Sequence, residues 1–258
     1  KKLEGLSHPF FYNDISSFKK IVKKNNIGAV FMEVQRNELP KNNFLEKVRE
    51  ITKNKNIVLI FDECSSGFRE TNGGIHKKFK IIPDLVIFGK SLGNGIPITS
   101  VLGKKEIMVK GEDSFISSTF WTDATGPAAE IATLKEMHKK KSWIEITKTG
   151  RKIKQYWKYL SKKYNIIINI QGLDAMPTFN FKHELDLYFR TYITQEMLQK
   201  NILATNTVYC CTLHNKFLKK YFIEFEKVFK KINYFIHTGN IMNSLKYPVV
   251  QPGFNRLN

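Results

Sequence analysis

The sequence predicts an α/β fold with a mostly parallel sheet, followed by a smaller C-terminal α+β domain. Residues 57–61 (Ile-Val-Leu-Ile-Phe) and 84–88 (Asp-Leu-Val-Ile-Phe) are short apolar runs that end abruptly at polar residues. Such runs are typical of parallel strands that are buried on both faces of a sheet. Residues 28–34 form an earlier run of the same kind, and a segment with helical spacing separates it from the run at 57–61. This strand–helix–strand order predicts a parallel pair.

The sheet domain is expected over residues 1–141. Its elements are, in order, a strand over 28–34 that ends at Glu33, a helix over 44–51, the strand 57–61, a long connection over 64–80, the strand 84–88, a Gly-rich loop over 89–97 and a further apolar stretch over 98–102. Pro127 predicts the start of the next helix, because its missing N–H costs nothing in a first helical turn.

The C-terminal domain is expected over residues 142–258, where long helical patterns replace the buried runs. Its elements are a helix over 143–160, strands over 166–170 and 177–181, a helix over 184–200, a second extended stretch over 202–211 and a last helix over 215–236. Gly and Pro punctuate the tail, residues 238–258, which is expected to lie on the surface.

The composition excludes some classes of protein. The chain has 258 residues and a formal net charge of +19, from 42 Lys and Arg against 23 Asp and Glu. A basic excess can indicate nucleic-acid binding. Here nearly all of it is Lys, and no segment combines dense Arg with interleaved aromatic residues, as a surface for single strands would. Nucleic-acid binding is therefore the less favoured alternative. No stretch approaches the roughly 20 apolar residues of a membrane span.

The cysteines and histidines carry no metal or disulfide pattern. Cys64, Cys210 and Cys211 show no spaced framework. Such a set favours a reducing, cytoplasmic compartment. The six histidines are scattered without metal-ligand spacing, so no metal site is expected.

Two residues at strand ends are the strongest candidates for a functional site. Asp62 follows the run at 57–61, and Lys90 follows the run at 84–88. Ligands of open α/β sheets bind beyond the carboxyl ends of the strands, so both residues are expected in one crevice. A buried carboxylate and a buried amine there indicate an anchored cationic ring and an amine nucleophile. The alternative, a metal-binding acid of an NTPase, needs a GxxxxGK(S/T) loop, which the sequence lacks.

The segments around these residues resemble class III pyridoxal-phosphate aminotransferases, most closely the glutamate-1-semialdehyde 2,1-aminomutase group. The resemblance implies a type I PLP-transferase fold like that of aspartate aminotransferase, the cofactor pyridoxal 5'-phosphate, and transfer of an amino group on a small amino or oxo substrate. The matching runs are Phe-Asp-Glu-Cys-Ser-Ser-Gly-Phe-Arg at 61–69, Pro-Asp-Leu-Val-Ile-Phe-Gly-Lys-Ser-Leu-Gly-Asn-Gly-Ile-Pro at 83–97, and shorter runs at 103–108, 117–121 and 253–258.

The resemblance implies roles for five residues. Lys90 matches the catalytic lysine that forms the Schiff base with the cofactor and shuttles the substrate proton. Asp62 matches the carboxylate that keeps the pyridine nitrogen protonated. Thr119 matches a threonine that reaches the cofactor phosphate of the neighbouring subunit, which implies a homodimer with shared active sites. Cys64 takes a place usually held by Val against the ring face, and Ser65 lies near the usual partner of the ring hydroxyl.

Two departures from the family pattern leave alternatives open. The aminomutase proper typically has Gly-Thr-Leu-Ser-Gly-Asn-Pro around the threonine, whereas residues 118–127 read Ser-Thr-Phe-Trp-Thr-Asp-Ala-Thr-Gly-Pro. This allows another oxo or amino substrate, for example in surface-polysaccharide synthesis. Family members also carry an earlier segment that cradles the cofactor phosphate at a helix N-terminus. The chain is therefore expected to be a C-terminal portion, with a truncated, inactive chain as the other alternative.

Overall fold

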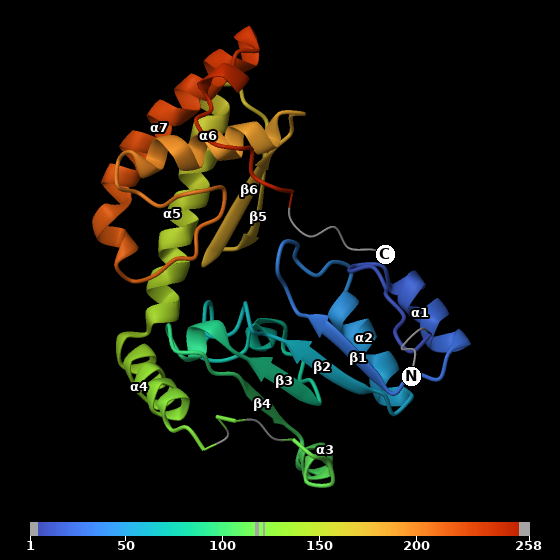
Figure 1. Ribbon diagram of the computed structural model, residues 1–258. Coiled ribbons are helices and arrows are strands. Elements are labelled where there is room, and N and C mark those ends of the chain that lie inside the picture. Colours follow the sequence, from blue (N-terminus) through green and yellow to red (C-terminus); the bar gives the residue numbers. More distant parts are fainter. Residues whose placement is uncertain (1–4, 117–118, 121, 253–258) are drawn as a thin grey trace. The chain divides into compact units, whose positions relative to one another are not determined.

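The computed structural model describes residues 5–116, 119–120 and 122–252. The chain divides into two compact units, Lys1–Trp143 and Ile144–Leu257 (Figure 1). Two segments that contribute to the family resemblance, 117–121 and 253–258, lie partly or wholly outside the described residues.

The first unit is built on a four-stranded sheet with the strand order β1-β2-β3-β4 (Figure 1). Strands β1 (Ala29–Glu33), β2 (Val58–Asp62) and β3 (Leu85–Phe88) are parallel, and β4 (Ser100–Gly103) pairs antiparallel with β3. The mostly parallel sheet predicted from the apolar runs is therefore confirmed.

Helices α1 (Ile15–Lys24) and α2 (Phe44–Asn54) pack on each other, and α2 packs against β2. Helix α2 matches a helix predicted from the sequence, whereas α1 was not among the predicted elements. Asp14 begins α1, because its Oδ1 accepts hydrogen bonds from the N–H groups of Ser16 and Ser17 at 3.0 Å, as an N-cap residue does. The remaining helical segments of this unit are η1 (Ile75–Phe79), η2 (Lys90–Leu92), α3 (Lys105–Met108), η3 (Val109–Gly111) and α4 (Thr125–Lys140).

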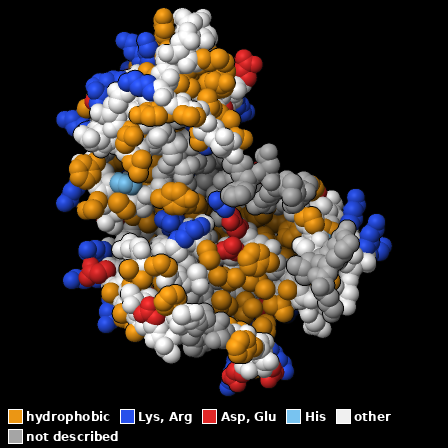
Figure 2. All heavy atoms as spheres, in the orientation of Figure 1, with side chains coloured by type: hydrophobic (Ala, Val, Ile, Leu, Met, Phe, Trp, Pro, Cys, Tyr) orange, Lys and Arg blue, Asp and Glu red, His pale blue; other side chains and the backbone are white. Residues whose placement is uncertain are grey.

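The sheet is buried on one face only, which corrects the prediction of strands buried on both faces. Side chains alternate along each strand, and Val30, Leu59 and Val86 are buried on the helix-covered face. On the other face Phe31 is 57% exposed and Val101 is 47% exposed. No described part of the first unit covers this open face, and Figure 2 shows hydrophobic side chains gathered over the sheet there.

The second unit packs three helices around a hairpin. These elements are α5 (Ser142–Lys163), β5 (Ile168–Leu173), β6 (Met176–Phe181), α6 (Asp186–Leu198) and α7 (His214–Thr238), with the short η4 (Met242–Ser244) after them. Strands β5 and β6, which overlap the strands predicted over 166–170 and 177–181, pair antiparallel.

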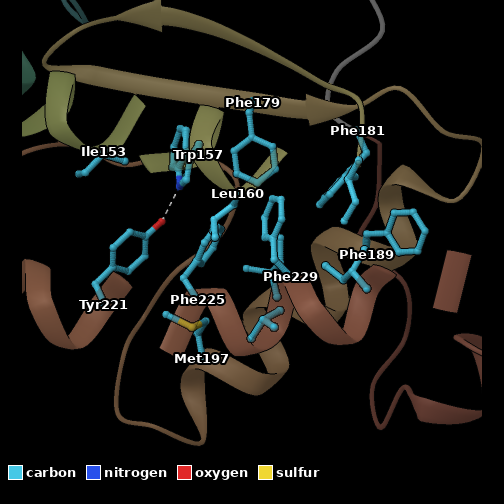
Figure 3. Close-up of a cluster of buried hydrophobic side chains, with 14 of the residues drawn as sticks. Ile153, Trp157, Leu160, Phe179, Phe181, Phe189, Met197, Tyr221, Phe225 and Phe229 are labelled. Carbon is cyan, nitrogen blue, oxygen red and sulfur yellow. Dashed lines mark hydrogen bonds between the residues drawn. The ribbon is translucent and has the colours of Figure 1, made fainter. Parts of the chain in front are cut away.

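Aromatic side chains from α5, β6 and α7 form the core of the second unit (Figure 3). Trp157 and Phe179 are fully buried and meet edge to face, with ring centroids 4.7 Å apart, a favourable arrangement for aromatic pairs. Trp157 Nε1 donates to Tyr221 Oη at 2.9 Å, so the buried indole N–H is satisfied.

The extended stretch predicted over 202–211 has no strand of its own, but part of it runs beside β6. Thr207 bridges to Thr178, the N–H of Phe179 donates to the carbonyl oxygen of Asn206, and the N–H of Val208 donates to that of Pro177, both at 3.0 Å.

The tail is not wholly at the surface, which corrects the expectation for it. Ile241 is fully buried in the core, and Gln195 on α6 binds the backbone of Ser244 and Lys246. The packing of Ile241 and the hydrogen bonds of Gln195 therefore hold this part of the tail against the second unit.

Candidate active site

The carboxyl ends of β2 and β3 bring Asp62 and the Lys90 loop to the same edge of the sheet. Asp62 is the last residue of β2, and Lys90 follows the end of β3 by two positions. The register aligns Glu33, Asp62 and Ile87 across three parallel strands, so Asp62 lies on the open face. Asp62 is half-buried, and its Oδ1 accepts a hydrogen bond from the N–H of Cys64 at 3.0 Å.

Lys90 is exposed, which corrects the prediction of a buried amine. The residue begins η2 with a left-handed φ of 46°, a conformation that is uncommon for a residue other than glycine. Its Nζ donates a hydrogen bond to Ser65 Oγ. The amine is therefore held by the loop after β2, and no described residue of the unit covers it from the solvent side.

Side chains on both loops fix this connection. Ser91 Oγ donates to the carbonyl oxygen of Gly67 at 2.8 Å, which joins the Lys90 loop to the 64–67 turn. Arg69 is buried, and its Nε donates to the carbonyl oxygen of Ser65 at 2.6 Å. Arg69 therefore braces the loop that presents Ser65.

Gly67 allows the turn after β2 to lie against β3. Its N–H donates to the carbonyl oxygen of Glu63 at 2.8 Å, which closes the turn. A Cβ at this position would lie 2.6 Å from Phe88 Cδ1, so a larger residue would push the turn away from β3. This close approach keeps Ser65 beside Lys90.

Cys64 is partly buried and is kept neutral by its surroundings. Burial raises the pKa of its thiol, and the adjacent Asp62 carboxylate raises that pKa further. Because the thiolate is the nucleophilic form of cysteine, these surroundings disfavour a nucleophilic role for Cys64.

The structure does not bring Thr119 into this cluster. Thr119 is exposed, and among the described residues it makes no hydrogen bond to Asp62, Cys64, Ser65 or Lys90.

Two other features lie beside the cluster. Glu33 forms an ion pair with Arg36 at 3.1 Å. Ser66 Oγ is buried, with no hydrogen-bond partner in the described part of the chain.

The sequence analysis gave no role to Glu63 or His76, which form a pair behind Asp62. The Asp-Glu doublet at the strand end was the visible signal, but the partner of Glu63 lies thirteen positions away.

Neither a metal centre nor a membrane span is found in the described part of the chain. No three His, Cys, Asp or Glu side chains among the described residues are placed to hold a metal ion. None of the helices within the described ranges has the length and apolar character needed to cross a membrane.

The fold is a mostly parallel α/β sheet with Asp62 and the Lys90 loop at one edge, and comparison with known proteins gives the family. The chain belongs to the class-III aminotransferase family, whose profile matches residues 6–237.

Two of the curated relatives have names that give different activities. The 3-aminobutyryl-CoA aminotransferase of Cloacimonas acidaminovorans is 33% identical over 210 residues, which are 76% of this chain and 50% of that protein. The glutamate-1-semialdehyde 2,1-aminomutase of Nitrosopumilus maritimus is 41% identical over 139 residues, which are 51% of this chain and 33% of that protein. This chain thus spans half or less of the length of these relatives.

Solved structures share the fold. The FumI protein of Sphingopyxis sp. MTA144, in a PLP internal aldimine form, has a TM-score of 0.80 at 20% identity, over 88% of this chain and 57% of that one. Ornithine aminotransferase from Plasmodium yoelii has a TM-score of 0.74 at 22% identity, over 85% of this chain and 61% of that one. The predicted type I PLP-transferase fold is confirmed.

Proposed function

We propose that this chain carries the lysine and the ring-binding carboxylate of a pyridoxal-phosphate-dependent aminotransferase or aminomutase. The observation that carries the proposal is the pairing of strand ends. Asp62 and Lys90 lie at one edge of a parallel sheet, and Lys90 is held by Ser65 from the loop that follows Asp62.

The residues present fit the cofactor chemically. A carboxylate suits the protonated pyridine nitrogen, an exposed primary amine suits an aldehyde, and the Ser65 hydroxyl lies beside that amine. When bound, pyridoxal phosphate supplies the electron sink that stabilises negative charge on the substrate carbon.

The roles of the chain's own residues follow from their positions. Asp62 would hold its negative charge toward the ring nitrogen, and the N–H of Cys64 fixes the direction of that carboxylate. Ser65 holds Nζ of Lys90, which would place this nitrogen to accept and return a proton at the substrate carbon. Cys64, whose thiol pKa is raised, would pack against the ring without taking part in the chemistry.

Thr119 and the exposed open face lead to a proposal about assembly. Thr119 is exposed and lies outside the cluster of its own chain, which suits a contact with the cofactor phosphate of a second copy. We therefore propose a homodimer with shared active sites, in a cytoplasmic compartment that keeps Cys64, Cys210 and Cys211 reduced.

The names of the relatives support two substrate classes. Several relatives are glutamate-1-semialdehyde 2,1-aminomutases, and another acts on 3-aminobutyryl-CoA. The aminomutase reaction is the first candidate, and transamination of another oxo or amino substrate is the second. Assays with glutamate 1-semialdehyde and with a panel of amino donors separate the two.

The central test is a labelling experiment on the full product of the gene. Pyridoxal phosphate is added, the protein is reduced with borohydride, and the modified peptide is mapped. Label on Lys90, its loss in Lys90→Arg, and its retention in Lys110→Arg support the proposal. Scattered label on many lysines, or equal label in the Lys90→Arg variant, would overturn it.

A further inference from the structure

Glu63 is a fully buried carboxylate that the proposed chemistry does not use. It follows Asp62 directly, and its side chain is 0% exposed. Because side chains alternate along a strand, Glu63 points to the face opposite Asp62. A buried carboxylate is costly unless hydrogen bonds satisfy it, so its partners show what it is fixed to.

Three donors from the start of η1 satisfy the Glu63 carboxylate. Oε2 accepts the N–H of Ile75, and Oε1 accepts the N–H of His76 at 3.1 Å. His76 Nδ1 lies 2.6 Å from the same Oε1. Since a carboxylate accepts, this imidazole nitrogen carries the proton.

The backbone of Glu63 is fixed as firmly as its side chain. Its N–H donates to the carbonyl oxygen of Ile87 on β3 at 2.9 Å, and its carbonyl oxygen accepts the N–H of Gly67 at 2.8 Å. One residue thus joins the end of β2 to β3, to the turn that carries Ser65, and to η1. Asp62 is its immediate neighbour in the chain.

We propose that Glu63 and His76 are a positioning pair for the cofactor site. The pair fixes the strand end from the covered face, so that Asp62 and Ser65 keep their places on the open face. All three donors to the Glu63 carboxylate belong to η1, so the pair ties the long connection after β2 to the strand end that carries Asp62. The proposal rests on the proposed function of Asp62 and Lys90, and neither Glu63 nor His76 touches the cofactor.

The test compares variants of His76 in the full product of the gene. His76→Ala removes the donor at Nδ1, whereas His76→Asn keeps an amide N–H close to that place. Glu63→Gln removes the charge and converts one acceptor to a donor. Lys77→Gln is the control, because Lys77 follows His76 in η1, is exposed, and donates from Nζ to the carbonyl oxygen of Asn72 within the same connection. Thermal unfolding of each variant is measured first, to separate loss of fold from loss of position.

The readouts are the dissociation constant of pyridoxal phosphate, the absorbance spectrum of the bound cofactor, and the borohydride label on Lys90. A displaced strand end is expected to weaken binding about tenfold or more in His76→Ala and Glu63→Gln, with an altered spectrum. His76→Asn is expected to restore both, and Lys77→Gln to change neither.

Two failures are distinguishable. If the wild-type protein gives no label on Lys90, the proposed function fails. If the wild type is labelled and the folded His76→Ala and Glu63→Gln variants bind the cofactor with wild-type affinity and spectrum, the positioning pair is refuted. The positioning pair is also refuted if His76→Asn binds the cofactor no better than His76→Ala.

Discussion

Asp84, directly before β3, is the centre of a charge network that holds the parallel strands together. Its carboxylate accepts two hydrogen bonds from Arg49, at 2.7 and 3.2 Å, and one from the N–H of Leu59 on β2, at 2.8 Å. Lys104 lies 2.8 Å away on the other side. Burial acts to raise the pKa of Asp84, but Arg49, Leu59 and Lys104 outweigh it and lower that pKa to about 2.

The lowered pKa sets the size of the expected effect. Asp84 is 5% exposed, and its pKa lies nearly two units below the ordinary value of 3.8. At 1.36 kcal/mol per unit, the charged form contributes about 2 kcal/mol to folding. Because the folded-state pKa is the lower one, this contribution is complete above about pH 4 to 5 and is lost as the pH falls toward 2. Asp84→Asn should therefore destabilise the first unit by about 2 kcal/mol at pH 7.

The assay is urea unfolding of wild type and Asp84→Asn at pH 7 and at lower pH. Hydrogen exchange of the peptide over 57–63 reports on the first unit alone, and the Leu59 amide is expected to lose protection. Glu38→Gln, which removes an exposed partner of Lys41, serves as a control that should leave the unfolding free energy unchanged. A difference under about 0.5 kcal/mol at pH 7 would refute the reasoning. So would a difference of equal size at pH 2.

Four further substitutions test other parts of the chain. Gly150→Ala would place a Cβ 1.6 Å from the carbonyl oxygen of Asp174, so a loss of about 3 kcal/mol or more in unfolding free energy is expected. Gly28→Ala, with nothing within 4 Å, should be nearly neutral. Tyr221→Phe leaves the buried Trp157 N–H without its acceptor and should cost about 1–3 kcal/mol by urea unfolding. An unchanged midpoint would show that the indole finds another partner. Ser65→Ala removes the acceptor of Lys90 Nζ and should weaken pyridoxal phosphate binding several-fold in a titration, while the label stays on Lys90. Loss of the label would instead show that Ser65 is needed to present the lysine.

The sequence was sufficient for the features that depend on local pattern. Apolar runs that end at polar residues predicted β2 and β3, and helical spacing predicted α2 and α7. Because parallel strands end at one edge of a sheet, the same runs predicted that Asp62 and Lys90 lie at the same edge. Helix α1 was not predicted, although Ile15, Phe18, Ile21 and Val22 have helical spacing and Asp14 supplies an N-cap.

Tertiary structure decided which faces are covered and which distant residues meet. The sheet is buried on one face only, because α1 and α2 supply apolar side chains on that side and no described part of the first unit does so on the other. For the same reason Lys90 is exposed instead of buried. Glu63 meets His76 through a turn and a connection whose course depends on packing against β3. Sequence spacing thus determined where the strand-end residues lie, and packing between distant segments determined what surrounds and holds them.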